Sequence, residues 1–425
     1  MTVVVAIVEG VERSLLQSLT QRGELDWFSR KLASSSYFKL GSGVVPYEPP
    51  NLTSAFSGVS PGEHGCFSYW ECDSDRGLPR VLDANDVKAP RVWNWPELAH
   101  KKFGVLNVQL THPPTAINGF LISYLMQQSL HYTFPADLAR RLNADGIRYA
   151  HDVSAFYRGE AAEFFSGEVT RIAQFQLDAA LHLASSVDIL ILNLTLADRV
   201  SHFLWAEVEN KPLDSNNHIV QAYRFLDAAL ARLEEKSAGD PMLVFSEMGF
   251  GPIDYFVSLD AELQKRGLQV LDNQGKVNVT KSVAMETVQG THGLKVIGNS
   301  AGYDKRVEEV CGVLKELIFQ DGTSIVANAR PREEVFHGPY VHLAPDIVIT
   351  PANLRRPPMG DQRWARHVNR ELQTGWHRSG GFGLLVGHAL AVSGDEFALE
   401  SIAPTVARLL GSDIPSFCKH PSLVA

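Results

Sequence analysis

The chain has 425 residues, of which 45% are hydrophobic, and it can therefore bury a large core. Its formal net charge of −9 argues against a broad electrostatic surface for nucleic acid. No apolar run is long enough to span a membrane, so no membrane association is expected. The partners expected are a small-molecule substrate and, at most, a second copy of the chain in a homodimer.

The N-terminal segment resembles a signal peptide only superficially. It has no basic start, and Glu9 and Gly10 end it after six apolar residues. We expect it to be the first core strand. The chain also contains no CxxC pair, so its cysteines are expected as reduced thiols in a cytoplasmic protein. These cysteines are Cys66, Cys72, Cys311 and Cys418.

Six apolar runs rich in Val, Ile and Leu are predicted to be buried strands. In chain order they are Val3–Val8, Phe103–Leu110, Val187–Leu196, Met242–Phe245, Asp346–Ile349 and Phe382–Val386. Segments between them have apolar residues at helical spacing. These are Ala161–Ser185, Asn217–Leu233, Arg306–Phe319 and Phe397–Leu410. Strands that alternate with helices predict an α/β fold with a mostly parallel sheet covered on both faces.

The pattern is compatible with a single domain over residues 1–425. Residues 113–160 or thereabouts have many aromatic, histidine and polar side chains but no strong period, so they are predicted to form an inserted cap over the sheet edge. A loop rich in proline and arginine is expected at 351–370, near the same edge.

A carboxylate and an imidazole stand four residues apart after the third predicted strand, at Asp198 and His202. If a helix starts there, positions i and i+4 share one face, so both side chains can bind one metal ion. Such a pair is more often a surface salt bridge or a helix start. It gains weight because open α/β sheets bind ligands at the carboxyl ends of their strands, and other polar residues adjoin predicted strands. These are Glu9, Glu247, His377 and Arg378.

Several motifs occur in a characteristic order. They are Ser57–Gly65, Asn107–Pro114 followed by Ile117–Phe120, Arg332–Gly338 with Ala344–Asp346, and Gly375–Gly381. The first is similar to a TGxxPGxHG signature and the last to a GxHRxxG element. Together they resemble the alkaline phosphatase superfamily, in its type I phosphodiesterase/nucleotide pyrophosphatase branch. The resemblance implies an alkaline phosphatase-like three-layer sandwich.

The resemblance also implies a dinuclear metal site, commonly zinc, and a Thr or Ser nucleophile. One metal ion would be held by Asp198, His202 and His377. The other would normally be held by an Asp, the nucleophile and an Asp-His pair. This sequence departs from the family pattern there, with Glu9 for the first Asp, Glu48 at the nucleophile position and Glu247-Met248 for Asp-His.

These departures change the expected mechanism, because a carboxylate cannot easily replace the Thr hydroxyl as a nucleophile. Instead, four carboxylates and two imidazoles would form the metal site: Glu9, Glu48, Asp198, Glu247, His202 and His377. This set matches in type the ligands of carboxylate-bridged di-iron and di-manganese proteins, so the second metal is more consistent with Fe, Mn or Mg than Zn. Glu48 and Glu247 are also the candidate catalytic residues, while Asn51 and Arg378 are candidates for substrate binding.

Three functions stay open at this stage. The first is hydrolysis of a phosphoester or related ester by metal-bound hydroxide, with two divalent ions drawn from Zn, Fe and Mn. The second is a redox or lyase enzyme with a carboxylate-rich Fe or Mn pair. The third is a non-catalytic relative that binds a ligand or a partner. We place hydrolysis first because it is the commonest chemistry of the superfamily.

Overall fold

The computed structural model describes residues 2–71, 80–153, 155–237, 239–287, 292–298, 300–358, 360, 370–387 and 392–424. The chain forms two compact units. The large unit comprises Met1–Val59, Asp83–Gly251 and Leu372–Ala425, and the small unit comprises Ser60–Leu82 and Pro252–Glu371. The single domain expected over residues 1–425 stays a prediction.

The large unit is built around a mixed sheet of nine strands within the described residues. The strands are β1 Val3–Val8, β2 Ser36–Gly41, β3 Phe103–Leu106, β4 Gly119–Ile122, β5 Thr133–Phe134, β6 Ile189–Leu194, β7 Met242–Ser246, β14 Gly381–Val386 and β15 Glu396–Ala398. Their order is β15-β2-β14-β7-β1-β6-β3-β4-β5. The five strands from β7 to β4 are parallel, whereas β14 is antiparallel to both of its neighbours.

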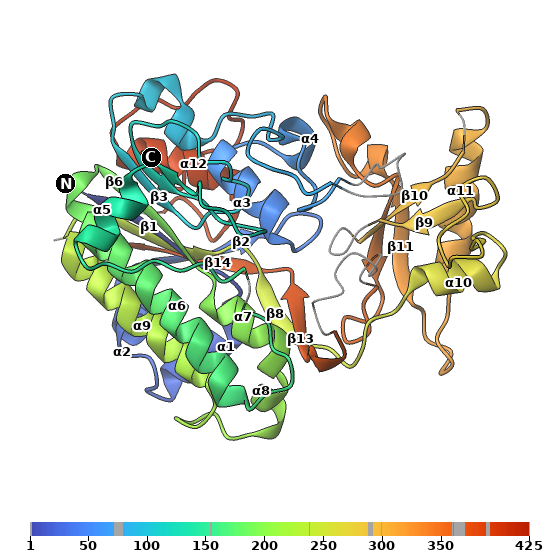
Figure 1. Ribbon diagram of the computed structural model, residues 1–425, viewed down its shortest axis with the longest axis horizontal. Helices are drawn as coiled ribbons and strands as arrows, with labels where there is room; N and C mark the ends of the chain where they lie inside the picture. Colours follow the sequence, from blue (N-terminus) through green and yellow to red (C-terminus); the bar gives the residue numbers. More distant parts are fainter. Residues whose placement is uncertain are drawn as a thin grey trace. The chain divides into compact units, whose positions relative to one another are not determined.

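Helices cover both faces of this sheet (Figure 1). On one side lie α1 Arg13–Gln21, α2 Asp26–Ser34, α6 Ala162–Leu183 and α9 His218–Ser237, with α7 Leu196–Leu204 and α8 Ala206–Asn210 packed against them. On the other side lie α3 Glu48–Ser57 and α12 Ile402–Leu409. Short 3₁₀ turns occur at Val92–Asn94, Pro96–Leu98, Ala184–Ser186 and Leu399–Ser401, and a further one, Arg370–Leu372, spans the point where the chain passes from the small unit to the large unit. The predicted three-layer α/β fold is therefore confirmed.

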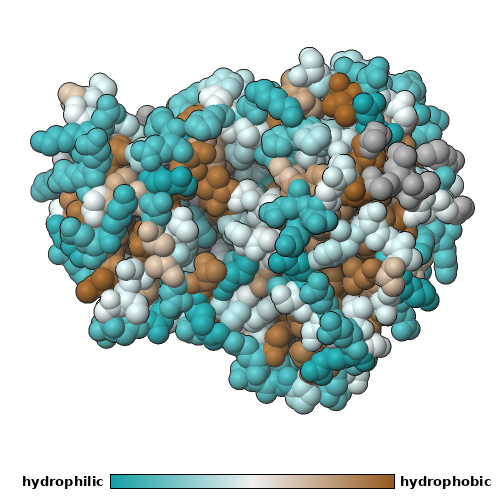
Figure 2. Space-filling view, turned by 180° about the vertical axis from the view of Figure 1, so that it is seen from behind, coloured by the Kyte–Doolittle hydropathy of each residue, from teal (hydrophilic) through white to brown (hydrophobic). Residues whose placement is uncertain are grey.

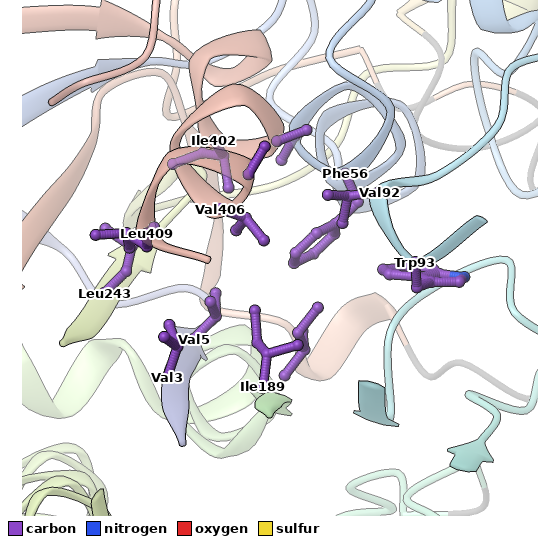
Figure 3. Close-up of a cluster of buried hydrophobic side chains, with 14 of the residues drawn as sticks. Val3, Val5, Phe56, Val92, Trp93, Ile189, Leu243, Ile402, Val406 and Leu409 are labelled. Atoms are coloured by element: carbon purple, nitrogen blue, oxygen red, sulfur yellow. The ribbon is translucent and has the colours of Figure 1, made fainter. Parts of the chain in front are cut away.

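The core forms because the central strands are apolar on both faces. Alternate residues of a strand point to opposite sides, so Val3 and Val5 of β1 face the same layer as Ile189 of β6. Figure 3 shows these side chains pointing toward Phe56 of α3 and Val406 of α12. All five are buried. This packing anchors α3, whose first residue, Glu48, is a predicted site residue.

The small unit contains a four-stranded antiparallel sheet with the order β11-β12-β10-β9 among its described residues. Its elements are β9 Ala284–Glu286, β10 Gly293–Val296, β11 Val326–Pro331, β12 Ile347–Pro351, α4 Pro61–His64, α10 Leu259–Lys265 and α11 Tyr303–Lys315, with 3₁₀ turns at Arg332–Glu334 and Val341–Leu343. The predicted strand Asp346–Ile349 thus exists, but in this second sheet.

Some element boundaries differ from the sequence pattern. The helix predicted at Phe397–Leu410 begins only at Ile402, because β15 and a 3₁₀ turn precede it. The strand predicted at Phe103–Leu110 ends at Leu106, because Asn107 and Leu110 adopt left-handed backbone conformations with φ of 61° and 55°. The segment 113–160 contributes β4, β5 and α5 Leu138–Ala144 to the large unit, and its role as a cap stays a prediction. In the loop predicted at 351–370, residue 359 and residues 361–369 lie outside the described part.

The surface and the thiols show no unusual feature within the described chain. Figure 2 shows polar side chains spread over the visible face, interrupted by small hydrophobic patches. None of the described helices is long and apolar enough to cross a membrane. Cys66, Cys311 and Cys418 form no disulfide, and Cys72 lies outside the described residues.

Candidate metal centre

The six predicted metal ligands come from five segments of the large unit. Glu9 directly follows β1, Glu48 is the first residue of α3, and α7 carries Asp198 and His202. Glu247 directly follows β7, and His377 lies on β13 Gly375–Arg378, which pairs with β8 Gly249–Pro252. All six side chains are buried. The fold therefore removes these polar groups from solvent. Once buried, they need hydrogen-bond partners or a bound cation.

Asp198, His202 and His377 bring three donor atoms together. The Nε2 atom of His377 lies 3.0 Å from Asp198 Oδ1 and 3.2 Å from His202 Nε2. The distance from His202 Nε2 to Asp198 Oδ1 is 3.5 Å. One aspartate and two imidazoles in this arrangement can hold a divalent ion such as Zn²⁺ or Fe²⁺.

The orientation of His377 supports a role as a metal ligand. Its Nδ1 atom lies 3.1 Å from the main-chain oxygen of Pro46. A carbonyl oxygen can only accept, so Nδ1–H is the donor, and in the neutral imidazole Nε2 then carries the lone pair. Metal-binding histidines commonly use their second ring nitrogen in this way. Burial also lowers the pKa of His202 to about 3, which keeps that imidazole neutral.

A second group of ligand atoms adjoins the first and shares Asp198 with it. One carboxylate oxygen from each of Glu9, Glu48 and Asp198 lies within 4.8 Å of the others. Because Asp198 belongs to both groups, its carboxylate can bridge two ions. The second group contains oxygen ligands only, which hard cations such as Mg²⁺ and Mn²⁺ prefer.

Two buried amides that the sequence interpretation missed hold Glu9 in place. Glu9 Oε2 accepts hydrogen bonds from Gln109 Nε2 at 2.6 Å and from Asn193 Nδ2 at 2.5 Å. Asn193 Nδ2 also donates to Gln109 Oε1 at 3.0 Å. A polar residue inside the apolar strand β6 is the signal that could have identified Asn193. This amide clamp occupies one oxygen of Glu9 and fixes its rotamer.

Other buried carboxylate oxygens have no such partners. Glu48 Oε2 and both carboxylate oxygens of Glu247 accept no hydrogen bond from another described residue. The nearest charge partner of Glu48 Oε2 is His377 Nδ1 at 3.9 Å, beyond hydrogen-bond distance. Since a buried carboxylate without hydrogen-bond donors is costly, these oxygens favour a proton or a cation. The donor set therefore fits the divalent ions that the resemblance implies, with Asp198, His202 and His377 at one position and Glu9, Glu48 and Asp198 at the other. Glu247, the sixth predicted ligand, belongs to neither group.

The pKa of Asp198 and the pKa values of the three glutamates shift in opposite directions. Burial, reinforced by the neighbouring carboxylates, raises the pKa of Glu9 and Glu247 well above the usual value and that of Glu48 to about 7. Burial would also raise the pKa of Asp198, but His202 and His377 lower it to about 2. Asp198 is thus an anion at neutral pH, while the glutamates need a cation to ionise fully.

The raised pKa of Glu48 predicts an unusual pH dependence of the metal-free protein. The carboxyl is protonated in both states below its unfolded pKa of about 4.5, so its contribution to stability is fully present there and is lost as pH rises through about 7. The rise in the pKa of Glu48 from 4.5 to about 7 corresponds to a loss of roughly 3 kcal/mol in the free energy of unfolding. We expect Glu48→Gln to remove this loss. Urea unfolding of the chelator-treated parent and Glu48→Gln proteins at pH 5 and pH 9 measures this loss of stability. An equal pH dependence in the two proteins would contradict the prediction.

Gly10 allows β1 and α7 to approach each other behind the site. A Cβ atom at Gly10 would lie 2.7 Å from Asp198 Cα and 2.9 Å from Asp198 N, and its φ is +74°. Gly23 has a φ of +75° but open space around its Cα. We expect Gly23→Ala to cost about 1 kcal/mol from backbone strain alone, and Gly10→Ala to cost about 2 kcal/mol more because the added methyl group overlaps α7. Denaturant unfolding of the two variants tests this, and equal losses would contradict the close contact.

The two predicted substrate-binding residues occupy different environments. Asn51 Oδ1 accepts from the Gly43 amide at 3.2 Å, and its buried Nδ2 has no hydrogen-bond partner among the described residues. Arg378 Nη1 donates to the main-chain oxygens of Trp376 at 3.3 Å and His377 at 2.9 Å. These bonds brace β13. Substrate binding by Asn51 and Arg378 stays a prediction.

Comparison with known proteins identifies the family. Residues 3–377 match the model of the type I phosphodiesterase / nucleotide pyrophosphatase family. The chain belongs to this family. A search of curated protein sequences finds no match.

Solved structures with the same fold are distant in sequence. Phosphonoacetate hydrolase from Sinorhizobium meliloti 1021, in complex with phosphonoformate, is 15% identical, with a TM-score of 0.60 over 91% of this chain and 89% of that chain. Wild-type alkaline phosphatase PafA is 15% identical, with a TM-score of 0.60 over 99% of this chain and 98% of that chain. Murine ectonucleotide pyrophosphatase / phosphodiesterase 5 is 11% identical, with a TM-score of 0.60 over 100% of both chains. These similarities confirm the alkaline phosphatase-like fold.

Proposed function

We propose that this member of the phosphodiesterase family is a metal-dependent hydrolase of a small phosphoester or pyrophosphate. The observation that carries the proposal is the convergence of Asp198, His202 and His377, whose donor atoms meet within 3.5 Å. The neighbours point to the same chemistry, since their names include a phosphonoacetate hydrolase, an alkaline phosphatase and a nucleotide pyrophosphatase.

Two divalent ions that prefer different ligand atoms suit this set of side chains. Asp198, His202 and His377 offer two nitrogens and one carboxylate, which suit Zn²⁺ or Fe²⁺. Glu9, Glu48 and Asp198 offer oxygens only, which suit Mn²⁺, Mg²⁺ or Fe²⁺ at a second position. Bound divalent ions supply a Lewis acid that polarises a phosphoryl oxygen and lower the pKa of water.

The side chains of this protein suit direct attack by water rather than a covalent route. Glu48 occupies the nucleophile position but has no hydroxyl to transfer a phosphoryl group to. Its carboxylate lies in the oxygen-only group beside Asp198, where it can accept a proton from the attacking water. Glu247, which is buried and accepts no hydrogen bond from another described residue, is the alternative base. The amide clamp of Gln109 and Asn193 holds Glu9 so that it contributes charge without changing rotamer.

Elemental mass spectrometry of protein purified without chelator or affinity metal tests the metal content. The same preparation is then assayed on phosphomonoesters, phosphodiesters and pyrophosphates. We expect one to two divalent ions per chain and turnover of at least one of these classes. A metal-loaded protein that hydrolyses none of them would contradict the proposal.

The carboxylate-rich group favours one alternative, a redox or lyase enzyme with an Fe or Mn pair. Its support is the oxygen-only set of Glu9, Glu48 and Asp198 together with the missing nucleophile. Two Fe or Mn per chain with dioxygen consumption, and no phosphoester turnover, would favour this alternative. A protein that binds no added metal would instead favour the non-catalytic relative.

A further inference from the structure

Glu9 is held by its main chain as well as by the amide clamp. Its main-chain amide donates to the main-chain oxygen of Leu194 at 3.2 Å, and its main-chain oxygen accepts from the amide of Asp198 at 3.1 Å. These bonds attach Glu9 to the end of β6 and to the first turn of α7. The backbone of Glu9 is therefore fixed beside Asp198, the residue that belongs to both ligand groups.

The amide clamp comes from adjacent strands of the large sheet. Strand β6 lies between β1 and β3, so Asn193 of β6 is placed between Glu9, which follows β1, and Gln109, which lies beyond the end of β3. After β3, Asn107 adopts a φ of 61°, and its Nδ2 atom donates to the main-chain oxygen of Asn193 at 3.2 Å. The turn that carries Gln109 is thus attached to β6.

The clamp uses one carboxylate oxygen of Glu9 and leaves the other. Gln109 and Asn193 both donate to Oε2, and a carboxylate oxygen has about two lone pairs to share. Within the described chain, Glu9 Oε1 accepts no hydrogen bond. The two amides also bond to each other, and both side chains are buried. A cation that binds Glu9 would therefore meet one oxygen, Oε1, rather than both.

The number of oxygens that a carboxylate offers affects which ion it suits. Ca²⁺ takes many oxygen ligands in flexible geometry and can bind both oxygens of one carboxylate. Mg²⁺ demands a nearly ideal octahedron of fewer ligands, and Mn²⁺ accepts the same kind of oxygen set. A rigid carboxylate that offers a single oxygen therefore favours Mg²⁺ or Mn²⁺ over Ca²⁺.

We infer that Gln109 and Asn193 are positioning residues that select the second metal ion, because they limit Glu9 to one metal-binding oxygen and so favour Mn²⁺ or Mg²⁺ over Ca²⁺. Groups that hydrogen-bond to metal ligands commonly change metal affinity by about tenfold to a hundredfold. The inference rests on the metal centre of the proposed function, but it does not depend on turnover.

The variant Gln109→Met tests this inference in the full-length protein carrying one equivalent of Zn²⁺, which the position with two imidazoles suits. Methionine has a side chain of similar length but no hydrogen-bond donor, so Glu9 Oε2 becomes available to a metal ion. We expect the ratio of the Kd for Ca²⁺ to the Kd for Mn²⁺ to fall about tenfold or more. Electron paramagnetic resonance of free Mn²⁺ gives one Kd, and displacement of Mn²⁺ by Ca²⁺ gives the other.

Gln174→Met is the matched control. Gln174 Nε2 donates to Asp178 Oδ1 at 2.8 Å, so the same substitution removes an amide from a carboxylate outside both ligand groups. The Kd ratio should stay at the parent value. A general loss of stability would weaken the binding of both ions together, so the ratio distinguishes a positioning role from a merely structural one. Asn193→Ala removes the other donor of the clamp and should shift the ratio in the same direction as Gln109→Met.

A ratio within twofold of the parent value in Gln109→Met, or in Asn193→Ala if only that variant folds, would overturn the inference. A parent protein that binds Ca²⁺ as tightly as Mn²⁺, or that binds no second ion, would overturn it as well. Metal binding requires no turnover. A protein whose clamp variants shift the ratio but which cleaves no phosphoester would therefore contradict the proposed hydrolase function alone.

Discussion

The variant His377→Ala should lose one metal ion per chain and about a thousandfold or more in kcat/KM. His377 Nε2 lies within 3.2 Å of both Asp198 Oδ1 and His202 Nε2, so its removal leaves two ligands where a tetrahedral site needs three or more. The remaining ligands should then bind the ion too weakly to retain it through purification. Elemental analysis and steady-state kinetics on the best substrate measure both effects.

His420→Ala provides the control for this experiment, because His420 is exposed and belongs to the same unit. It should keep the parent metal content and the parent kcat/KM. Circular dichroism of both variants checks that the fold is retained. If His377→Ala kept its full metal content and activity, the trio of Asp198, His202 and His377 would not be the metal centre.

Glu48→Thr should lose the second metal ion without gaining phosphodiesterase activity. Threonine restores the hydroxyl that the family uses, but its side chain is shorter than that of Glu48 and cannot complete the oxygen-only group with Glu9. The position also lacks the Asp-His pair that accompanies a threonine nucleophile, since Glu247 and Met248 stand there. We expect kcat/KM to fall about a hundredfold, because the second metal ion would be lost.

Two further variants separate the possible roles of Glu48. Glu48→Gln keeps the shape of the side chain but removes its negative charge, so it should lose the second ion to a similar degree. Glu163→Gln, at an exposed position on α6, should change neither property. A gain of aryl phosphodiester cleavage in Glu48→Thr, with a phosphoryl group detected on the introduced threonine by mass spectrometry, would show instead that Glu48 only replaces a nucleophile.

Much of the fold could be predicted from local sequence patterns. The apolar run Val3–Val8 coincides with β1, and the helical spacing at Ala161–Ser185 corresponds to α6. These patterns are reliable because side-chain periodicity is a property of neighbouring residues. The antiparallel placement of β14 beside β7 could not be predicted in this way, because strand pairing depends on contacts between residues far apart in the chain.

The candidate site was likewise predictable only in part from the sequence. The sequence by itself determined the family, through its ordered motifs, and the chemical types of the candidate ligands Asp198, His202 and His377. The spacing of Asp198 and His202 was sufficient because both lie on one helix, α7.

Only the tertiary structure decided how these ligands combine. It placed Asp198 in both ligand groups and left oxygens of Glu48 and Glu247 without hydrogen bonds from other described residues. It also brought Gln109 and Asn193 to Glu9. Burial and hydrogen-bond satisfaction arise when distant segments pack together, so no local pattern in the sequence specifies them.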